Sequence, residues 1–230
     1  MNKRKFLATA ALPVCLGLVF SSMAGATTLP LSSSLSETGA FVESWSGSYN
    51  LGIIGGVQLA NGVLNESVYC NGTFSGGKCS GGLDFLYQMQ NLSPSPSGDP
   101  IETLSLSGFG GSTVVSSTYY TASASNVTNN VGTPAFVNAS GSGGVPTGAS
   151  ISGVGTINFT GMALLGGYGD ILEVSTNATT LTTGIAAVID TGSQDFYNAL
   201  VPAPEPLWSG LFLTAILGAG LFATRRRRNA

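Results

Sequence analysis

Apolar and polar residues alternate along most of the chain, which is the pattern of β-strands with one buried face. In the segment Leu83-Asp-Phe-Leu-Tyr-Gln-Met-Gln90, every second residue from Leu83 to Met89 is apolar. These residues are predicted to point one way, and Leu86 is the apolar exception on the opposite face. Between residues 41 and 200, no window combines helical apolar spacing with helix-forming residues and an absence of glycine. The pattern therefore predicts an all-β domain.

Further segments with strand character complete a set of about nine. They are 40–47, 50–59, 63–70, 102–107, 112–121, 150–161, 170–176 and 184–190. The turn-rich segments 93–100, 108–112 and 141–148 separate several of them. Short strands with such turns predict a β-sandwich or jelly-roll-like fold. A β-solenoid is the architectural alternative, but it needs a repeat of fixed period, and the sequence has none.

The segment 121–150 is rich in Gly, Ser, Thr and Asn. This composition buries little apolar surface, so we expect a long and poorly determined excursion there.

The N-terminus has the features of a Sec-type signal peptide. Basic residues at 3–5 precede the apolar stretch 6–20, and the small residues Ala24 and Ala26 occupy the positions that a signal peptidase reads. We predict a helical signal peptide over 1–26, cleaved after Ala26. Cys15 lies within the apolar stretch and lacks the preceding small residues of a lipoprotein acylation site.

The C-terminus combines three features. Pro204, Glu205 and Pro206 precede an apolar segment of 18 residues, 207–224, and Arg225, Arg226, Arg227 and Arg228 follow it. A helix of that length spans about 27 Å, close to the ~30 Å hydrocarbon core of a bilayer. An arginine at mid-membrane costs about 2.5–3.5 kcal/mol, so the arginines hold this end of the predicted transmembrane helix in the cytoplasm. The intervening domain is then predicted to lie outside the inner membrane.

This tail resembles the PEP-CTERM sorting signal of Gram-negative bacteria. The resemblance implies recognition by the sorting enzyme exosortase, release from a transient inner-membrane anchor and delivery to the cell surface or the extracellular exopolysaccharide matrix. The predicted organisation is a signal peptide (1–26), an exported domain (27–200) and a sorting signal (201–230).

A second, weaker resemblance covers much of the exported domain. Its segments 83–91, 99–102, 104–111, 168–178 and 184–190 look like the middle of many PEP-CTERM cargo domains. In those relatives such segments are sandwich strands, so the resemblance supports the fold and implies no ligand.

Charge is distributed unevenly along the chain. The segment 27–203 contains Lys78 as its single basic residue and ten acidic residues, which gives a net charge of about −9. Such a domain lacks the basic surface that nucleic acid or anionic lipid requires. We therefore expect no nucleic-acid partner.

Two cysteines, Cys70 and Cys79, remain after removal of the predicted signal peptide. An even pair in an oxidising compartment most simply forms a disulfide. Loop closure would then stabilise the domain by about 2.5–3 kcal/mol. The alternative, a two-ligand metal site, would have no histidine to complete it.

The side chains available restrict the chemistry. The chain has no histidine, which excludes His-activated nucleophiles and imidazole metal ligands. A carboxylate pair, as in glycoside hydrolysis, is the remaining catalytic possibility, with Asp84 and Glu173 as mid-strand candidates. Scattered acids more often lie on the solvated surface, so we expect no catalytic, cofactor or metal site. Ca²⁺ ligands from Asp99, Glu102 or Asp170 are conceivable, but they lack an Asp-x-Asp-x-Asp-Gly loop.

Carbohydrate enters the interpretation in two ways. Aromatic residues on a sandwich face could stack on sugar rings, although alternating aromatics are usually core. The candidates are Trp45, Tyr49, Tyr69, Tyr119 and Tyr120. Asn-x-Ser/Thr triplets, explained by composition or by glycosylation, begin at Asn65, Asn71, Asn91, Asn126, Asn138, Asn158 and Asn177.

Three functions are therefore compatible with the sequence. The first is an exported structural protein of the cell surface or exopolysaccharide matrix, without catalytic activity. The second is a lectin-like carbohydrate-binding module, and the third is a carboxylate-dependent glycoside hydrolase.

Overall fold

The computed structural model of this chain describes residues 25–54, 57–92, 100–111, 113–190 and 193–203. These residues form an all-β, sandwich-like fold with two six-stranded sheets and one short 3-10 helix, η1 (Ala124–Asn126). Within these ranges there is no helix with the length and hydropathy that crossing a membrane requires. The predicted signal peptide up to residue 24 and the predicted transmembrane helix 207–224 lie outside the described residues.

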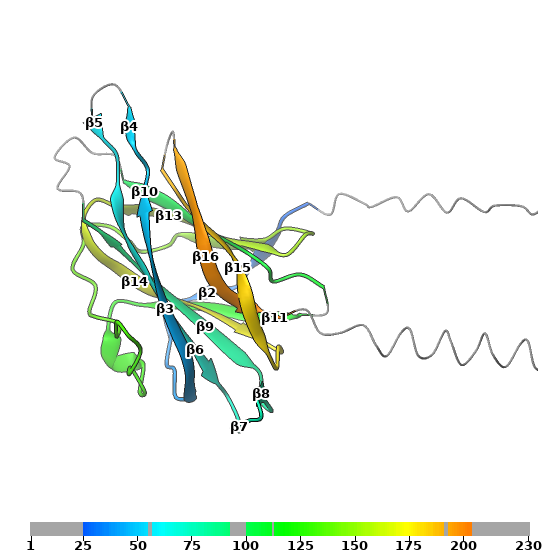
Figure 1. The fold of residues 1–230 in the computed structure, drawn as a ribbon. Coiled ribbons are helices and arrows are strands. Elements are labelled where there is room, and N and C mark those ends of the chain that lie inside the picture. The colour runs from blue at the N-terminus through cyan, green and yellow to red at the C-terminus, as the bar shows by residue number, and fades with distance from the viewer. Residues whose placement is uncertain (1–24, 55–56, 93–99, 112, 191–192, 204–230) are drawn as a thin grey trace, which may run out of the picture.

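The first sheet, which we call sheet A, is antiparallel throughout. Its strands, in spatial order, are β1 (Thr27–Leu29), β12 (Gly148–Ile151), β13 (Thr156–Leu164), β10 (Ile101–Ser107), β15 (Leu181–Ile189) and β16 (Gln194–Pro202). β15 and β16, in yellow and orange, are the strands of sheet A at the front of the molecule in Figure 1.

The second sheet, sheet B, is antiparallel except for the parallel pair β2 and β11. Its strands, in spatial order, are β2 (Leu31–Ser32), β11 (Val115–Thr121), β14 (Gly167–Thr176), β9 (Leu83–Asn91), β6 (Asn61–Cys70) and β3 (Ala40–Asn50). Two small hairpins are made by β4 (Ile53–Ile54) with β5 (Val57–Gln58) and by β7 (Phe74–Ser75) with β8 (Lys78–Cys79).

Most predicted strands are confirmed, two are wrong, and one long observed strand was not predicted. The predicted strand 150–161 is wrong because the chain turns at Ser152–Gly155, where Gly155 has a φ of +77° and its N–H bonds the Ser152 carbonyl at 2.9 Å. The predicted strand 50–59 is also wrong, since only the small β4–β5 hairpin forms there. β16, which extends past the predicted domain end at 200, had no predicted counterpart.

The two sheets are connected along both of their long edges. On one side, β1 and β2 lie in different sheets and are separated by Pro30 alone, so the chain itself crosses between the sheets. On the other side, the N–H of Asn50 bonds Asp195 Oδ2 at 2.7 Å. Trp45 of β3 also stacks on Tyr197 of β16, with ring centroids 6.3 Å apart. Both edges of the sandwich are therefore held together.

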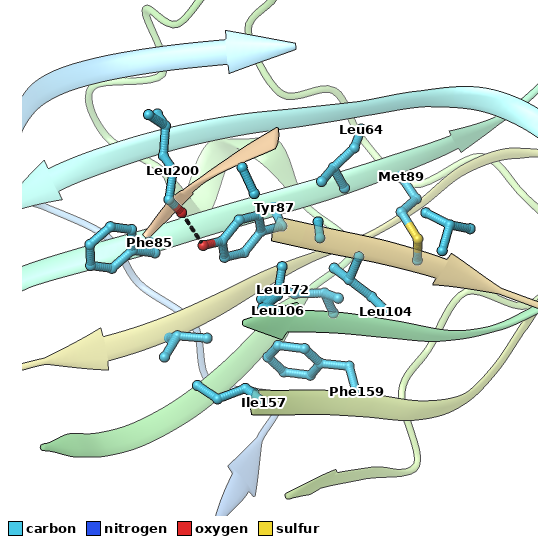
Figure 2. Close-up of a cluster of buried hydrophobic side chains, with 14 of the residues drawn as sticks. Leu64, Phe85, Tyr87, Met89, Leu104, Leu106, Ile157, Phe159, Leu172 and Leu200 are labelled. Carbon is cyan, nitrogen blue, oxygen red and sulfur yellow. Dashed lines mark hydrogen bonds between the residues drawn. The ribbon is translucent and has the colours of Figure 1, made fainter. Parts of the chain in front are cut away.

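The main core lies between the sheets and is built on the alternation predicted for β9. Leu83, Phe85, Tyr87 and Met89 all point into it, as predicted. Figure 2 shows Phe85, Tyr87 and Met89 clustered with Leu104 and Leu106 of β10, which belongs to the other sheet. The Tyr87 hydroxyl donates to the Leu200 carbonyl at 2.7 Å. This bond satisfies the polar end of a fully buried ring.

A second apolar cluster lies on the outer face of sheet B. It consists of Leu35, Tyr69, Leu86, Val127, Phe136 and Ile171. Val127 and Phe136 come from the segment 122–147, which we call the covering segment; Figure 1 shows it in green beside sheet B. Leu86, the exception in the alternation of β9, is buried beneath it.

The covering segment corrects one expectation. The excursion between β11 and β12 is long and almost free of regular structure, as expected, but it is packed rather than poorly determined. Polar side chains of the sheet bind its backbone: Gln88 accepts the Val137 N–H at 3.0 Å and donates to the Val137 carbonyl at 2.7 Å. A segment rich in Ser, Thr and Asn is therefore ordered by hydrogen bonds as well as by its few apolar residues.

The predicted disulfide between Cys70 and Cys79 is confirmed, with Cα atoms 5.6 Å apart. It joins the end of β6 to β8, in the short β7–β8 hairpin that precedes β9.

One acidic residue, Glu66, lies in the main core. Its Oε2 accepts the N–H of Leu200 at 2.6 Å, whereas its Oε1 has no hydrogen-bond partner among the described residues. Burial raises the pKa of Glu66 to about 8, although the Leu200 bond opposes this effect. Tyr87 and Tyr197 are the titratable groups that face it, and both stay neutral at ordinary pH.

We predict that the stability of the protein falls as pH rises from about 5 to 8, in part because of Glu66. The folded state holds a proton on Glu66 that the unfolded state releases near pH 4.5, so raising the pH favours unfolding. The contribution is at most about 4 kcal/mol over that interval, at about 1.4 kcal/mol per pKa unit. Urea unfolding of Glu66→Gln at pH 5 and pH 8 should show a smaller fall than the parent, whereas Glu43→Gln, at an exposed position, should match the parent. An unchanged fall in Glu66→Gln would contradict the assignment.

Candidate functional site

Three acidic side chains meet on the outer face of sheet B. Asp84 lies on β9 and Glu173 on the neighbouring β14, where Ser175 is opposite Asp84 and Glu173 is opposite Leu86. Residues opposite each other in a sheet share a face, so Asp84 and Glu173 are diagonal neighbours. Glu37 reaches them from the segment that leads into β3. We call these three residues the carboxylate cluster.

The carboxylate cluster is compact and buried. One oxygen from each side chain lies within 4.8 Å of the corresponding oxygens of the other two. Glu37, Asp84 and Glu173 are 2, 3 and 5 % exposed. The expectation that the scattered acids are solvated surface is therefore wrong for these residues, and also for Glu66, Asp170 and Asp190.

The covering segment holds Glu37 in place through its backbone. The N–H of Glu37 donates to the Asn126 carbonyl at 2.8 Å, and the N–H of Thr128 donates to the Glu37 carbonyl at 2.8 Å. These bonds form an isolated parallel bridge between Glu37 and Val127. The position of Glu37 over the sheet is therefore coupled to the docking of the covering segment.

Short polar contacts orient the carboxylates. The Ser175 hydroxyl donates to Glu173 Oε1 at 2.7 Å, and the Asn71 side-chain amide donates to Asp84 Oδ2. Asn71 directly follows Cys70, so the disulfide-linked end of β6 carries the partner of Asp84. The N–H of Gly39 donates to Glu37 Oε1.

Burial and mutual repulsion raise the pKa values of the three carboxyl groups. Burial, followed by the charge of Asp84, raises the pKa of Glu37 to about 8 and that of Glu173 to about 7. Burial also raises the pKa of Asp84. The one basic side chain of the described residues, Lys78, is exposed on β8. The cluster therefore needs protons or a cation to offset its negative charge.

The sequence singled out two of the three members. Asp84 and Glu173 form the predicted candidate pair because both are mid-strand, and the structure places them together. Glu37 was missed because its segment has no strand pattern, and its approach depends on contacts with residues 126–128. No local signal in the sequence could have placed it there.

The acids that the sequence left conceivable as Ca²⁺ ligands do not join the carboxylate cluster. Asp170 lies on β14 and Glu102 on β10, and neither belongs to the carboxylate cluster. Asp99 lies outside the described residues, as do Ala24 and the sorting residues Pro204, Glu205, Pro206 and Arg225, Arg226, Arg227 and Arg228.

The aromatic residues proposed for sugar stacking are largely unavailable. Tyr49 and Tyr69 are buried, which corrects that assignment. Trp45, Tyr119 and Tyr120 are half-buried and pack against the two apolar clusters. Among the Asn-x-Ser/Thr triplets, Asn65 and Asn91 are buried and could not carry a glycan in the folded domain.

No family model, no curated protein and no solved structure matches this chain.

We predict that Gly39→Ala destabilises the protein by about 1–3 kcal/mol. A Cβ at position 39 would lie 2.7 Å from the carbonyl oxygen of Cys70 and 2.8 Å from Glu37 Oε1, so the backbone entering β3 would have to shift. Gly148→Ala is the matched control, because its Cβ would meet only Thr160 Oγ1, at 3.2 Å. Equal urea midpoints for the two variants would contradict the close approach at Gly39.

Proposed function

We propose that this chain is an exported structural protein of the cell surface or exopolysaccharide matrix. The observation that carries the proposal is the Cys70–Cys79 disulfide, because structural disulfides persist in oxidising compartments outside the cytoplasm. The signal-peptide pattern and the resemblance of the tail to PEP-CTERM signals support the same route. The predicted cleavage after Ala26 falls directly before β1, so it would leave every strand of the domain intact.

The proposed route has defined partners. The Sec translocase and signal peptidase act on residues 1–26, and the segment 207–224 is a transient inner-membrane anchor. An exosortase-type enzyme then processes the tail near Pro204–Pro206. The released domain is a sandwich, jelly-roll-like in class, that associates with exopolysaccharide.

We propose no catalytic activity for the domain. Asp84 and Glu173 are close enough to act as a carboxylate pair, but a glycoside hydrolase must bring both carboxyl groups against a sugar ring. Side chains that are 3 and 5 % exposed beneath a packed segment cannot make that contact.

The test of the proposal is the intact mass of protein recovered from the surface of a Gram-negative cell that has the sorting enzyme. We expect a chain that begins at Thr27, contains one disulfide and lacks Arg225–Arg228. Replacing Pro204, Glu205 and Pro206 by alanine is the control, and it should leave the tail attached in the inner membrane. Surface material that still carries the four arginines would refute the proposed sorting.

A second candidate function is carbohydrate binding, and one surface favours it. On the outer face of sheet A, one cross-strand row contains hydroxyl, amide and apolar side chains and no charged ones. The row consists of Thr28, Ser150, Asn158, Ser105, Ala187 and Phe196. Phe196 is 59 % exposed there, so its ring can stack on a sugar, unlike the aromatic residues proposed from the sequence.

If this face binds carbohydrate, Phe196→Ala should weaken retention on the producer's own exopolysaccharide by at least about fivefold, equivalent to about 1 kcal/mol. Val131→Ala, at another exposed apolar position, is the control and should be retained like the parent. Retention can be measured by affinity electrophoresis in gels that contain the polysaccharide. Equal retention of both variants would exclude the outer face of sheet A as a carbohydrate-binding surface.

A further inference from the structure

One oxygen in the carboxylate cluster is left without a partner. Asp84 Oδ2 accepts the Asn71 amide, whereas Asp84 Oδ1 is buried and has no hydrogen bond of normal geometry among the described residues. Glu37 and Ser175 are the other groups that interact with this carboxylate. An unsatisfied buried carboxylate oxygen costs free energy, and the cost is larger when other carboxylates are close. Two things can satisfy it: a proton shared with Glu37, or a cation bound by all three side chains.

The donor set suits a hard divalent cation. All three side chains offer carboxylate oxygens, with no nitrogen or thiolate among them, and such oxygens are the ligands of Ca²⁺ and Mg²⁺ rather than of Zn²⁺ or Cu²⁺. Three carboxylates supply three to six oxygens, and Ca²⁺ takes 6–8. We propose that Glu37, Asp84 and Glu173 form a Ca²⁺-binding site that fastens the covering segment to β9 and β14.

Burial favours Ca²⁺ over Mg²⁺. Ca²⁺–oxygen bonds of about 2.3–2.6 Å span up to about 5.2 Å between opposite oxygens, so one ion can bind all three side chains, whose oxygens lie within 4.8 Å of one another. Mg²⁺ retains several waters in a near-ideal octahedron. A site this deeply buried has little room for such a hydrated ion.

Bound Ca²⁺ would join elements that are far apart in the sequence. Asp84 and Glu173 belong to adjacent strands of sheet B, and Glu37 bonds to Asn126 and Thr128 of the covering segment. The ion would offset the repulsion between the carboxylates and hold Glu37 against the sheet. The covering segment would then open less often when Ca²⁺ is present.

The first experiment measures Ca²⁺ directly. Protein produced from the 230-residue chain is unfolded in chelator with its disulfide intact, refolded and freed of chelator. It is then divided into samples with and without CaCl₂ or MgCl₂ at one fixed pH. Calorimetric titration should give one Ca²⁺ per chain, with a Kd of about 10⁻⁴–10⁻³ M as in extracellular Ca²⁺ modules. The melting temperature should rise by about 5–10 °C at a Ca²⁺ concentration of 100 times the Kd. No binding heat and no rise at 10 mM CaCl₂, or an equal response to MgCl₂, would overturn the assignment.

Substitutions test whether the carboxylate cluster is the part of the molecule that binds Ca²⁺. Asp84→Asn and Glu173→Gln each remove one charged ligand and should weaken Ca²⁺ binding at least about tenfold, while the Ca²⁺-free proteins stay folded because repulsion is reduced. Asp170→Asn is the matched control, since Asp170 is a buried acid on β14 outside the cluster. It should bind Ca²⁺ like the parent. A Ca²⁺ response kept in both cluster variants, or lost in Asp170→Asn, would place the ion elsewhere.

A structural measurement keeps the test informative even if one variant fails to fold. In the parent protein, Ca²⁺ should slow hydrogen exchange of the Thr128 amide, which bonds to Glu37, by about tenfold or more. The amide of Thr147, which bonds to Thr160 at the other end of the covering segment, should change much less. Identical exchange at Thr128 with and without Ca²⁺ would show that no ion fastens this segment.

Discussion

Strand β9 is buried on both faces, and this requires a layer of the molecule on each side of sheet B. Leu83, Phe85, Tyr87 and Met89 fill the main core, while Leu86 and Gln88 point the other way and are also fully buried. A strand in a two-layer antiparallel sandwich commonly leaves one face to water. A doubly buried strand needs a third layer, and the covering segment provides it. The paired hydrogen bonds of Gln88 with Val137 show how a loop without strands satisfies its backbone on the sheet it covers.

The third layer has an electrostatic consequence. Asp84 lies on the same face of β9 as Leu86 and Gln88, so covering these residues also removes a carboxylate from water. Lys78, the one basic side chain that the structure describes, is exposed on the β7–β8 hairpin. Buried charges are usually tolerated because they are paired with opposite charges. Among the described residues, the buried acids have no buried basic partner. The stability of the folded state therefore depends on protonation of these acids or on a bound cation.

The sequence predicted those features that depend on near neighbours. The alternation in β9 placed its core face correctly because the period of a strand is local, and the Cys70–Cys79 pair is separated by a short loop. Leu86 is the one apolar residue on the opposite face of this predicted strand. It is therefore the sign, within the sequence, that a second apolar cluster covers that face. The turn at Ser152–Gly155 was missed because the apolar pattern continues through it while a single glycine with positive φ reverses the chain.

The carboxylate cluster could be predicted only in part, for a related reason. Asp84 and Glu173 are recognisable as acids within strands, but their meeting requires that β9 pair with β14 in one particular register. Glu37 joins them through backbone bonds to Asn126 and Thr128, and nothing near Glu37 in the sequence specifies these partners. Period-two patterns indicate which face a residue occupies and leave its neighbours across the sheet undetermined.

The position of the cluster in the topology indicates when it forms. The disulfide closes a loop with a sequence separation of 9 and precedes β9 directly, so its closure has a low entropic cost. The cluster needs contacts between residues 37, 84, 126–128 and 173, whose sequence separations are much larger. Contacts of long sequence separation form slowly, because the entropy of closing a long loop opposes them. Because Glu37 bonds to the covering segment, a cation bound at the cluster would act on the docking of that segment onto sheet B. Under the proposed export this step takes place outside the inner membrane, where a disulfide and a Ca²⁺ site can be completed in the same compartment.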